Sequence, residues 1–166
     1  MTPQMIDKAT KLAEKNNYVN VEFKLAEIEE LPVEDNSVDV IISNCVINLS
    51  IDKASVFKES YRVLKHNGRM MISDIVLTRE LPDFIKNSME AYANCISGAL
   101  LKDEYIKAIK DAGFRDINII GEKVYPFDLL SCDPVVAEFL EDNKVEEAQL
   151  IEIASTILSI QVAARK

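Results

Sequence analysis

The sequence is poor in glycine and histidine and contains no tryptophan. Among its 166 residues there are 4 glycines, where an average usage of about 7% would give roughly 12. No two of these glycines are close enough to form Gly-x-Gly, which excludes a glycine-rich nucleotide-binding loop within this chain. With His66 as the single histidine, the sequence favours neither a catalytic triad nor a histidine-based metal site.

Cysteine is scarce as well, and its spacing excludes two common uses. The three cysteines are Cys45, Cys95 and Cys132, and no Cys-x-x-Cys occurs. An odd number at long spacings argues against a disulfide framework and against a zinc ribbon. We therefore expect no metal cofactor, and each cysteine has to be interpreted from its own surroundings.

Positive charge is also in deficit. The chain has 19 Lys and Arg against 28 Asp and Glu, a net charge of −9. Nucleic-acid binding needs clustered basic side chains to neutralise phosphates, and no such cluster occurs. No stretch approaches the ~18 apolar residues of a membrane span, and the charged segment Met1–Lys15 lacks the apolar core of a signal peptide. The sequence predicts a cytoplasmic protein with neither nucleic acid nor membrane as a partner.

What remains is the composition of a folded domain. Hydrophobic residues make up 48% of the chain, and its length suits one domain of roughly 100–200 residues. Periodicity in the first half predicts a helix that starts at Thr2-Pro3 and an alternating strand over Val19–Leu25. The nearly continuous apolar run at 38–43 predicts a parallel strand buried on both faces. A helix over 53–65, a turn at Asn67-Gly68 and a strand over 69–76 complete a strand–helix–strand unit.

The second half of the chain continues the alternation of helices and strands. The pattern predicts helices that start at 82 or 83 and at 133, helices over 102–112 and 145–154, and strands over 116–124 and 158–163. The last two strands are expected to pair antiparallel. The whole predicts an α/β domain whose sheet is mostly parallel with an antiparallel C-terminal strand.

Two cysteine-bearing segments are distinctive within this frame. They are Ser43-Asn44-Cys45-Val46-Ile47-Asn48-Leu49 and Tyr92-Ala93-Asn94-Cys95-Ile96-Ser97-Gly98-Ala99-Leu100. Together with Met1-Thr2-Pro3-Gln4-Met5 and Gly68-Arg69-Met70-Met71-Ile72-Ser73-Asp74, they resemble the arsenite methyltransferases, a group of class I S-adenosylmethionine-dependent methyltransferases. The resemblance covers nearly the full chain. It implies a class I methyltransferase (Rossmann-like) sheet with helices on both faces.

The resemblance also implies a missing part. In this family the first strand, the glycine-rich cofactor loop and the acidic residue that holds the cofactor ribose precede the segment that Met1–Met5 resembles. Residues 1–166 are therefore expected to form a single, N-terminally truncated methyltransferase-like domain. We expect this chain alone to bind S-adenosylmethionine weakly and to be impaired as an enzyme.

The resemblance assigns the arsenic-binding thiolates to Cys45 and Cys95. Trivalent arsenic is a soft centre that prefers thiolate to oxygen or imidazole, so its methylation requires neither a general base nor a metal ion. Position alone leaves a structural interpretation open for both, because an unpaired cysteine is commonly a small core residue. Cys132 matches no family segment and is interpreted as a surface or half-buried thiol.

The cofactor is assigned to a second group of residues by the same resemblance, namely Met1, Ile28, Glu29 and Asn44. From the residues themselves, Ile28 and Glu29 are equally compatible with an exposed acidic turn, and Asn44 with a polar cap at a strand end. Asp74 ends the following predicted strand and is a weaker candidate to face the site.

The substrate implied is arsenite or thiol-bound arsenic. Without the strands that the family places beside it, the Val38–Ser43 strand keeps an apolar edge, and such edges recruit partners. We expect either a homodimer through this edge or a rearranged sheet in which Val19–Leu25 fills the gap. Two alternative functions stay open: a carbon methyltransferase of the quinone-biosynthesis type, and a non-catalytic thiol-based module that binds arsenite.

Overall fold

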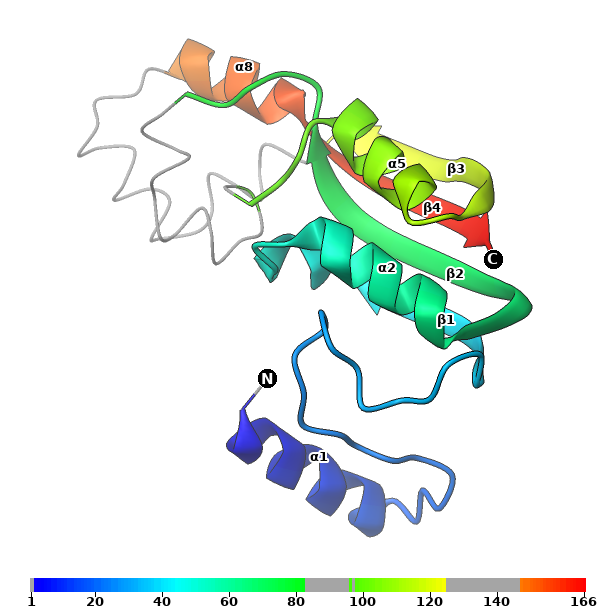
Figure 1. The fold of residues 1–166 in the computed structure, drawn as a ribbon. Helices are drawn as coiled ribbons and strands as arrows, with labels where there is room; N and C mark the ends of the chain where they lie inside the picture. Colours follow the sequence, from blue (N-terminus) through cyan, green and yellow to red (C-terminus); the bar gives the residue numbers. More distant parts are fainter. Residues whose placement is uncertain (1, 83–95, 97, 125–146) are drawn as a thin grey trace.

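The computed structural model describes residues 2–82, 96, 98–124 and 147–166 (Figure 1). The elements alternate between helix and strand along these residues. In chain order they are α1 (Pro3–Lys15), β1 (Val38–Asn44), the short 3-10 helix η1 (Ile47–Leu49), α2 (Lys53–Val63), β2 (Leu64–Leu77), α5 (Lys102–Asp111), β3 (Arg115–Val124), α8 (Glu147–Thr156) and β4 (Ile157–Arg165). The expected helices that start at 82 or 83 and at 133 lie outside the described residues.

The four strands form one sheet in the order β1-β2-β4-β3. β1 pairs with β2 in parallel, while β4 lies antiparallel to both β2 and β3. Three strands therefore point the same way and the C-terminal strand opposes them, which confirms the predicted sheet. The expected antiparallel pairing of the last two strands is confirmed in the same contacts, for example Ile119 opposite Val162.

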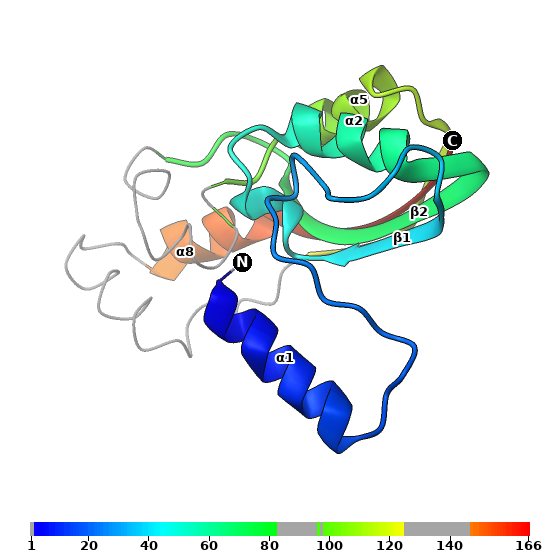
Figure 2. The ribbon, with the colours of Figure 1, turned by 60° about the horizontal axis from the view of Figure 1, so that its bottom comes forward.

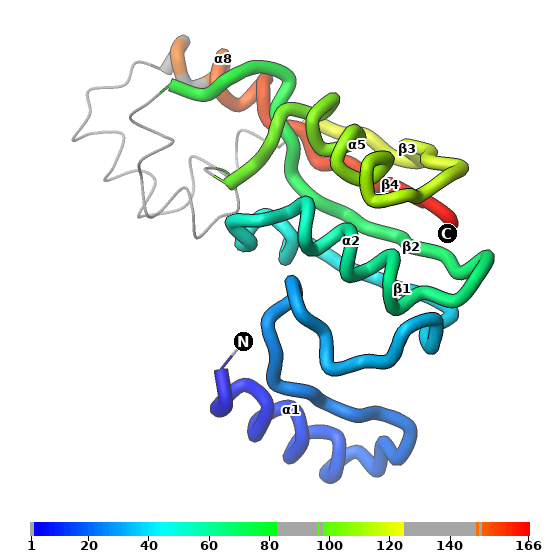
Figure 3. Tube along the Cα trace, viewed as in Figure 1, coloured from blue at the N-terminus to red at the C-terminus, as the bar shows by residue number. Residues whose placement is uncertain are grey.

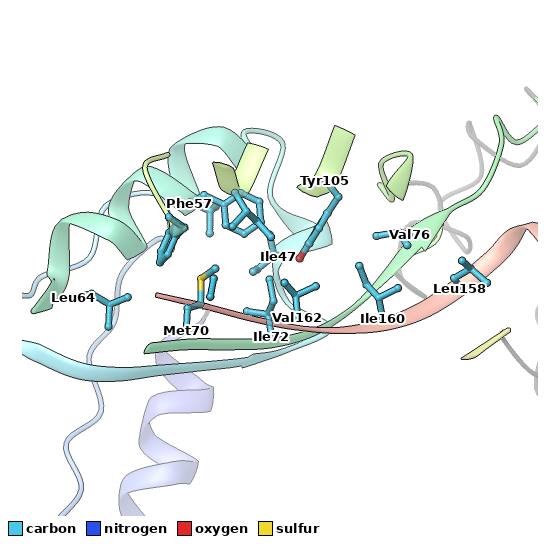
Figure 4. Packing of buried hydrophobic residues seen from close by; sticks show 14 residues of the cluster. Ile47, Phe57, Leu64, Met70, Ile72, Val76, Tyr105, Leu158, Ile160 and Val162 are labelled. Atoms are coloured by element: carbon cyan, nitrogen blue, oxygen red, sulfur yellow. The ribbon is translucent and has the colours of Figure 1, made fainter. Parts of the chain in front are cut away.

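α2 and α5 lie side by side on one face of the sheet (Figure 2). Alternate residues of β2 and β4 point toward these helices, because side chains along a strand alternate between faces. Among them, Met70, Ile72 and Ile160 pack with Phe57 of α2 and Tyr105 of α5 in the main core (Figure 4). The Phe57 and Tyr105 rings meet edge to face with centroids 5.3 Å apart. This layer holds α5, and with it Tyr105, against the sheet.

The opposite face of the sheet is covered only in part. α1 lies on that side of the sheet (Figure 2), and near the end of β2, Ile153 of α8 packs against a second cluster that contains Ile75 and Ile157. Helices thus stand on both sides of the sheet, as the resemblance implies. Toward the other end of the same face, Ile42 is 79% exposed and Met71 is 45% exposed.

The expectation that the 38–43 strand is buried on both faces is therefore wrong. An apolar run shows that a strand can be covered on two sides, and whether a covering element is present is decided elsewhere in the chain. Ile41 packs against the main core, whereas its neighbour Ile42 points to the open face.

The expected strand over Val19–Leu25 is also wrong. These residues form no strand and pair with none of the four strands, and Val19 and Leu25 are 96% and 52% exposed. Figure 3 shows them within the long connection that returns from α1 toward β1. A strand needs a neighbour to complete its hydrogen-bond ladder, and alternation alone supplies none. The rearranged sheet is excluded with it, because β1 is the edge strand of the described sheet.

The predicted turn at Asn67-Gly68 is an irregularity within a longer strand. β2 begins at Leu64, directly after α2, and the register with β1 shifts between the pairs Val38–Leu64 and Val40–Arg69. Asn67 takes a left-handed φ of 63° there, a conformation that asparagine tolerates better than most residues.

The connection before β1 is fastened to α2 by charged side chains. Glu59 accepts a hydrogen bond from the Leu31 backbone N–H at 2.7 Å and is itself bound by the Arg62 guanidinium. Arg62 also contacts Asp35 of the connection. Because hydrogen bonds from Arg62 favour the charged carboxylate, the pKa of Glu59 lies below its ordinary value. These contacts hold the acidic turn that precedes Leu31 close to the sheet.

Candidate functional site

The candidate site is built around the turn that leads from β1 to η1. β1 ends at Asn44, and Cys45 then adopts a left-handed φ of 53°, which is uncommon for a residue with a side chain. In open α/β sheets ligands gather outside the carboxyl ends of the parallel strands, and this turn lies at that end of β1. The position predicted for the site from the sequence is thus a backbone location with an unusual conformation.

Three hydrogen bonds join this turn to three consecutive residues of β2. The Cys45 backbone N–H donates to the Ser73 carbonyl at 2.9 Å. The Asn48 backbone N–H donates to the Asp74 carboxylate, and the Asn48 side-chain amide donates to the Ile75 carbonyl at 2.7 Å. Asn48 is fully buried, so these bonds are shielded from competing water.

Asp74 is a carboxylate enclosed by the protein, with 1% of its surface exposed. Its Oδ1 accepts from the Ile75 backbone N–H at 2.9 Å, and its Oδ2 accepts from the Tyr105 hydroxyl at 3.0 Å. Figure 4 shows Tyr105 reaching from α5 to the sheet with its hydroxyl oxygen at the tip. Burial raises the pKa of Asp74, while its hydrogen bonds and the charge of Lys53 act in the opposite direction. Burial and the Asp74 charge together raise the pKa of Tyr105.

The Cys45 thiol is half-buried beside this carboxylate. It packs against the second cluster, in which its neighbours include Ile75 and Ile96. Burial raises the pKa of Cys45, and the negative charge of Asp74 raises it further. Both effects favour the protonated thiol, because each disfavours a negative charge on sulfur.

Lys53 closes the turn from the helix side. It is a buried lysine, 7% exposed, whose ammonium donates to the Ser50 carbonyl at 2.9 Å and to the Asn48 carbonyl at 3.4 Å. These are carbonyl groups at the end of η1, where a cation is favoured.

The segment after Cys95 lies against the same turn. Gly98 approaches the Asn48 carbonyl so closely that a side-chain carbon at this position would collide with it. Ile96 is 4% exposed and belongs to the cluster against which Cys45 packs. Cys95 itself, like Met1 and Cys132, lies outside the described residues.

The residues assigned to the cofactor gather at the same strand end in part. Ser50, at the end of η1, donates a hydrogen bond to the Glu29 carboxylate. Ile28 packs against the main core, so the acidic turn is docked on the domain and is less exposed than a free surface turn. Asn44 is exposed at the last position of β1 and lies opposite Ser73.

The sequence interpretation missed Asn48, Lys53 and Tyr105 as parts of the site. Asn48 stands inside the first cysteine segment, so the resemblance contained a signal for it. Tyr105 belongs to the apolar stripe of a helix and Lys53 to the first turn of another, and neither position is distinguishable from core or surface by periodicity. Their role depends on contacts between α2, α5 and β2 that no local pattern specifies.

The described residues include no group of three or more His, Cys, Asp or Glu side chains that could hold a metal ion. Within the same residues, no helix has the length and apolar character needed to cross a membrane.

Comparisons with known proteins agree with this arrangement. A family model described as a methyltransferase domain matches residues 1–113. An arsenite methyltransferase from Halobacterium salinarum is 45% identical over 119 residues, which are 72% of this chain and 30% of that protein. An arsenite methyltransferase from Aquipseudomonas alcaligenes is 37% identical over 139 residues, or 82% of this chain and 39% of that protein. The chain thus spans between about a third and two fifths of the length of these relatives.

A second kind of relative is more distant. A ubiquinone/menaquinone biosynthesis C-methyltransferase from Rickettsia bellii is 32% identical over 136 residues, which are 69% of this chain and 55% of that protein. Among solved structures, the fold is similar to an arsenic(III) S-adenosylmethionine methyltransferase from Chlamydomonas reinhardtii, with a TM-score of 0.74 and 29% identity. That similarity covers 98% of this chain and 52% of the other.

Proposed function

This chain belongs to the methyltransferase-domain family, and on that premise we propose that it is the arsenic-binding part of an S-adenosylmethionine-dependent arsenite methyltransferase. The observation that carries the proposal is the position of Cys45 in the turn at the carboxyl end of β1, within the segment 43–49. The identity of 45% to a curated arsenite methyltransferase supports arsenic as the substrate over other methyl acceptors.

In this proposal Cys45 and Cys95 are the two thiols that bind arsenic. Each thiol replaces one hydroxide of arsenous acid: the S–H and As–O bonds break, an S–As bond forms, and the proton leaves with the hydroxide as water. Trivalent arsenic favours such sulfur ligands. The contacts of Ile96 and Gly98 with the Cys45 turn support a common site for the two cysteine segments.

S-adenosylmethionine, when bound, supplies an electrophilic methyl group. Met1, Ile28, Glu29 and Asn44 are the residues proposed to hold it, and the hydrogen bond between Glu29 and Ser50 supports this for the described part. It brings a carboxylate to the loop that carries Cys45, where it suits the polar parts of the cofactor. The chain's remaining task is to hold arsenic with its lone pair toward the methyl group, and such alignment dominates the barrier of a displacement.

Cofactor binding by the 166 residues alone is proposed to be weak. A glycine-rich turn lets backbone N–H groups approach a bound nucleoside cofactor closely, and this chain contains no Gly-x-Gly. The loss of several kcal/mol of binding energy amounts to a thousandfold or more, since each ~1.4 kcal/mol is tenfold. Such weak cofactor binding would impair the isolated chain as an enzyme.

We further propose that residues 1–166 form one truncated domain, that the protein is cytoplasmic, and that two copies associate through β1. The support for a homodimer is that β1 is the edge strand of the described sheet and that Ile42 is 79% exposed. A strand edge beside an open apolar face is a template for pairing with a second chain.

Arsenite titration into the purified chain tests the arsenic site. We expect one arsenic per chain, with C45S and C95S each weakening binding at least about tenfold because one sulfur ligand is lost. C132S is the matched control and should bind as the unsubstituted chain does. Unchanged binding in both C45S and C95S would refute the arsenic site and favour the quinone-type alternative, which the 32% identical relative supports.

Calorimetric titration with S-adenosylmethionine separates the enzyme from a module that only binds arsenite. Weak but saturable heat, together with slow methyl transfer to arsenite, supports the enzyme part. Arsenite binding without any heat from the cofactor would support the non-catalytic module instead. Methyl transfer at the rate of a full-length relative would contradict the proposed impairment.

A further inference from the structure

We propose that Asp74 is a positioning residue for Cys45: its enclosed carboxylate, held by Tyr105, fixes the turn after β1 and places a negative charge beside the thiol. The inference about the thiol stands on the contacts within the chain. Only its consequence for arsenite rests on the proposed function.

The first step of the argument is the conformation of the turn. Cys45 is held at a φ of 53°, and a side chain in this region costs of order 1–3 kcal/mol unless the surroundings enforce it. Enforcement comes from the bonds of Cys45 and Asn48 to residues 73–75 of β2. The middle one of these three residues is Asp74, so its carboxylate accepts the bond at the centre of the joint.

The second step is the number of groups that converge on this carboxylate. It accepts from the Ile75 backbone, the Asn48 backbone and the Tyr105 hydroxyl, which belong to three different elements. Its neighbours along the same face of β2, Ile72 and Val76, are apolar core residues. A charged group in such surroundings is expensive to bury and is kept in place only by a full set of partners.

The third step is what the charge does to the thiol. Three ionisable groups surround the turn: Asp74 from β2, Tyr105 from α5, and Lys53 from α2, whose charge acts on Asp74. The neighbours of Cys45 in the second cluster are apolar. A carboxylate beside sulfur disfavours the thiolate, which is the form that alkylating agents and oxidants attack.

Arsenous acid differs from those reagents, because its condensation with a thiol consumes the proton as water. The Asp74 charge therefore slows reagents that need a thiolate without opposing the uptake of neutral arsenous acid. Asp74 would in this way contribute to the selectivity of the Cys45 site as well as to its geometry.

Alkylation by iodoacetamide tests the proposal on the full chain in the absence of arsenite. The thiolate sulfur attacks the methylene carbon, iodide leaves, and the thiol proton passes to solvent. Mass spectrometry of the Cys45 peptide follows this cysteine separately from Cys95 and Cys132. In D74N, we expect the rate at pH 7 to rise at least about threefold and the pH profile to move to lower pH, since the thiolate is the reacting form.

Y105F is the matched control, because it removes one bond to Asp74 but keeps the charge. It should lower stability without moving the pH profile of Cys45 alkylation. D74E, which restores the charge, should return the profile toward that of the unsubstituted chain. An unchanged profile in D74N, or an equal shift in Y105F, would overturn the proposal.

A second variant covers the case in which D74N fails to fold. K53Q keeps a hydrogen-bond donor near the Ser50 carbonyl and removes the positive charge that faces Asp74. With the carboxylate less compensated, alkylation of Cys45 at pH 7 should become slower than in the unsubstituted chain. A rate that is equal or faster contradicts the proposed action of the Asp74 charge. Because arsenite takes no part in either assay, a failure here is distinct from a failure of the proposed function.

Discussion

Gly98 illustrates how a single residue joins two segments of the site. The absence of a side chain allows the backbone at 98 to lie against the Asn48 carbonyl, while Lys53 approaches the same carbonyl from α2. This contact is the part of the junction between the two cysteine segments that the structure describes directly.

The variant Gly98→Ala should therefore destabilise the fold by about 1–3 kcal/mol, the usual range for forcing an extra carbon into a packed site. The obstacle is a backbone carbonyl, which cannot turn away as a side chain can. Gly121→Ala is the matched control, because its new carbon would meet the flexible end of Gln161. Urea unfolding measures both, and equal losses in the two variants would contradict the role of the Asn48 contact.

Glu59 gives a prediction on the pH dependence of stability. Its pKa in the fold is lowered, chiefly by the Arg62 hydrogen bonds. A carboxylate with a lowered pKa stabilises the fold above its unfolded pKa of about 4.3, and this contribution is lost as the pH falls through the folded value. Glu59→Gln should therefore lose stability at pH 7 and show a shallower decline between neutral and acid pH.

The free energy of unfolding in urea at several pH values measures this effect. Glu14→Gln, on the exposed side of α1, serves as the control and should leave the slope unchanged. A slope in Glu59→Gln as steep as in the unsubstituted chain would show that Glu59 does not contribute to the acid sensitivity.

Among the elements, α1 depends least on the rest of the fold. It is capped by Thr2, whose hydroxyl oxygen accepts from the Met5 backbone N–H at 3.3 Å, and Ala13 is its buried residue. A helix with so little tertiary packing is stabilised mainly by its own sequence.

Thr2→Ala should weaken α1 by about 1 kcal/mol, the typical value of such a cap, with little effect on global unfolding. Hydrogen exchange followed by mass spectrometry should show faster exchange within 3–15 and unchanged exchange in β2 and β4. Thr10→Ala removes a hydroxyl from the exposed interior of the same helix and is the control. Equal acceleration in both variants would exclude capping as the cause.

At this scale the sequence predicts most of the described elements but not their coverage. The helices at 3–15, 53–63 and 102–111 and the strand that contains Ile160 follow from periodicity, because each buries a face that the pattern marks. The alternation of Val19–Leu25 marks a face equally well, and yet no strand forms, since no neighbouring strand is present to pair with. Pairing partners are a property of the whole sheet.

The same limit applies to the candidate site. Cys45 and Asn44 could be identified because a strand end and a family segment coincide there. The Asp74–Tyr105 bond joins residues 31 positions apart, and neither residue has a local signal for the other. A site that depends on a contact between a strand and a later helix becomes visible only in three dimensions.

For the whole molecule, the open face beside the edge strand β1 is the main feature without a covering element among the described residues. Ile42 and Met71 lie opposite each other on that face, 79% and 45% exposed. A homodimer that continued the sheet across β1 would bring the Ile42 side chains of two copies onto one extended face.

Ile42→Lys should consequently shift the protein toward the monomer, because like charges would meet across the joined strands. Sedimentation velocity over a range of concentrations measures the association. Ile51→Lys is the matched control, since Ile51 is 97% exposed and lies outside the sheet. A monomer at every concentration in the unsubstituted chain would contradict the proposed dimer.

The bond between Tyr105 and Asp74 also gives the protein an intrinsic optical probe. The chain has no tryptophan and five tyrosines, so its near-ultraviolet spectrum is dominated by phenol rings. Tyr105 is fully buried and donates its hydroxyl proton to a carboxylate, which gives its absorption and emission a different environment from that of an exposed ring such as Tyr18. Any ligand that displaces the Cys45 turn or the Asp74 carboxylate should therefore change the tyrosine signal, without an added label.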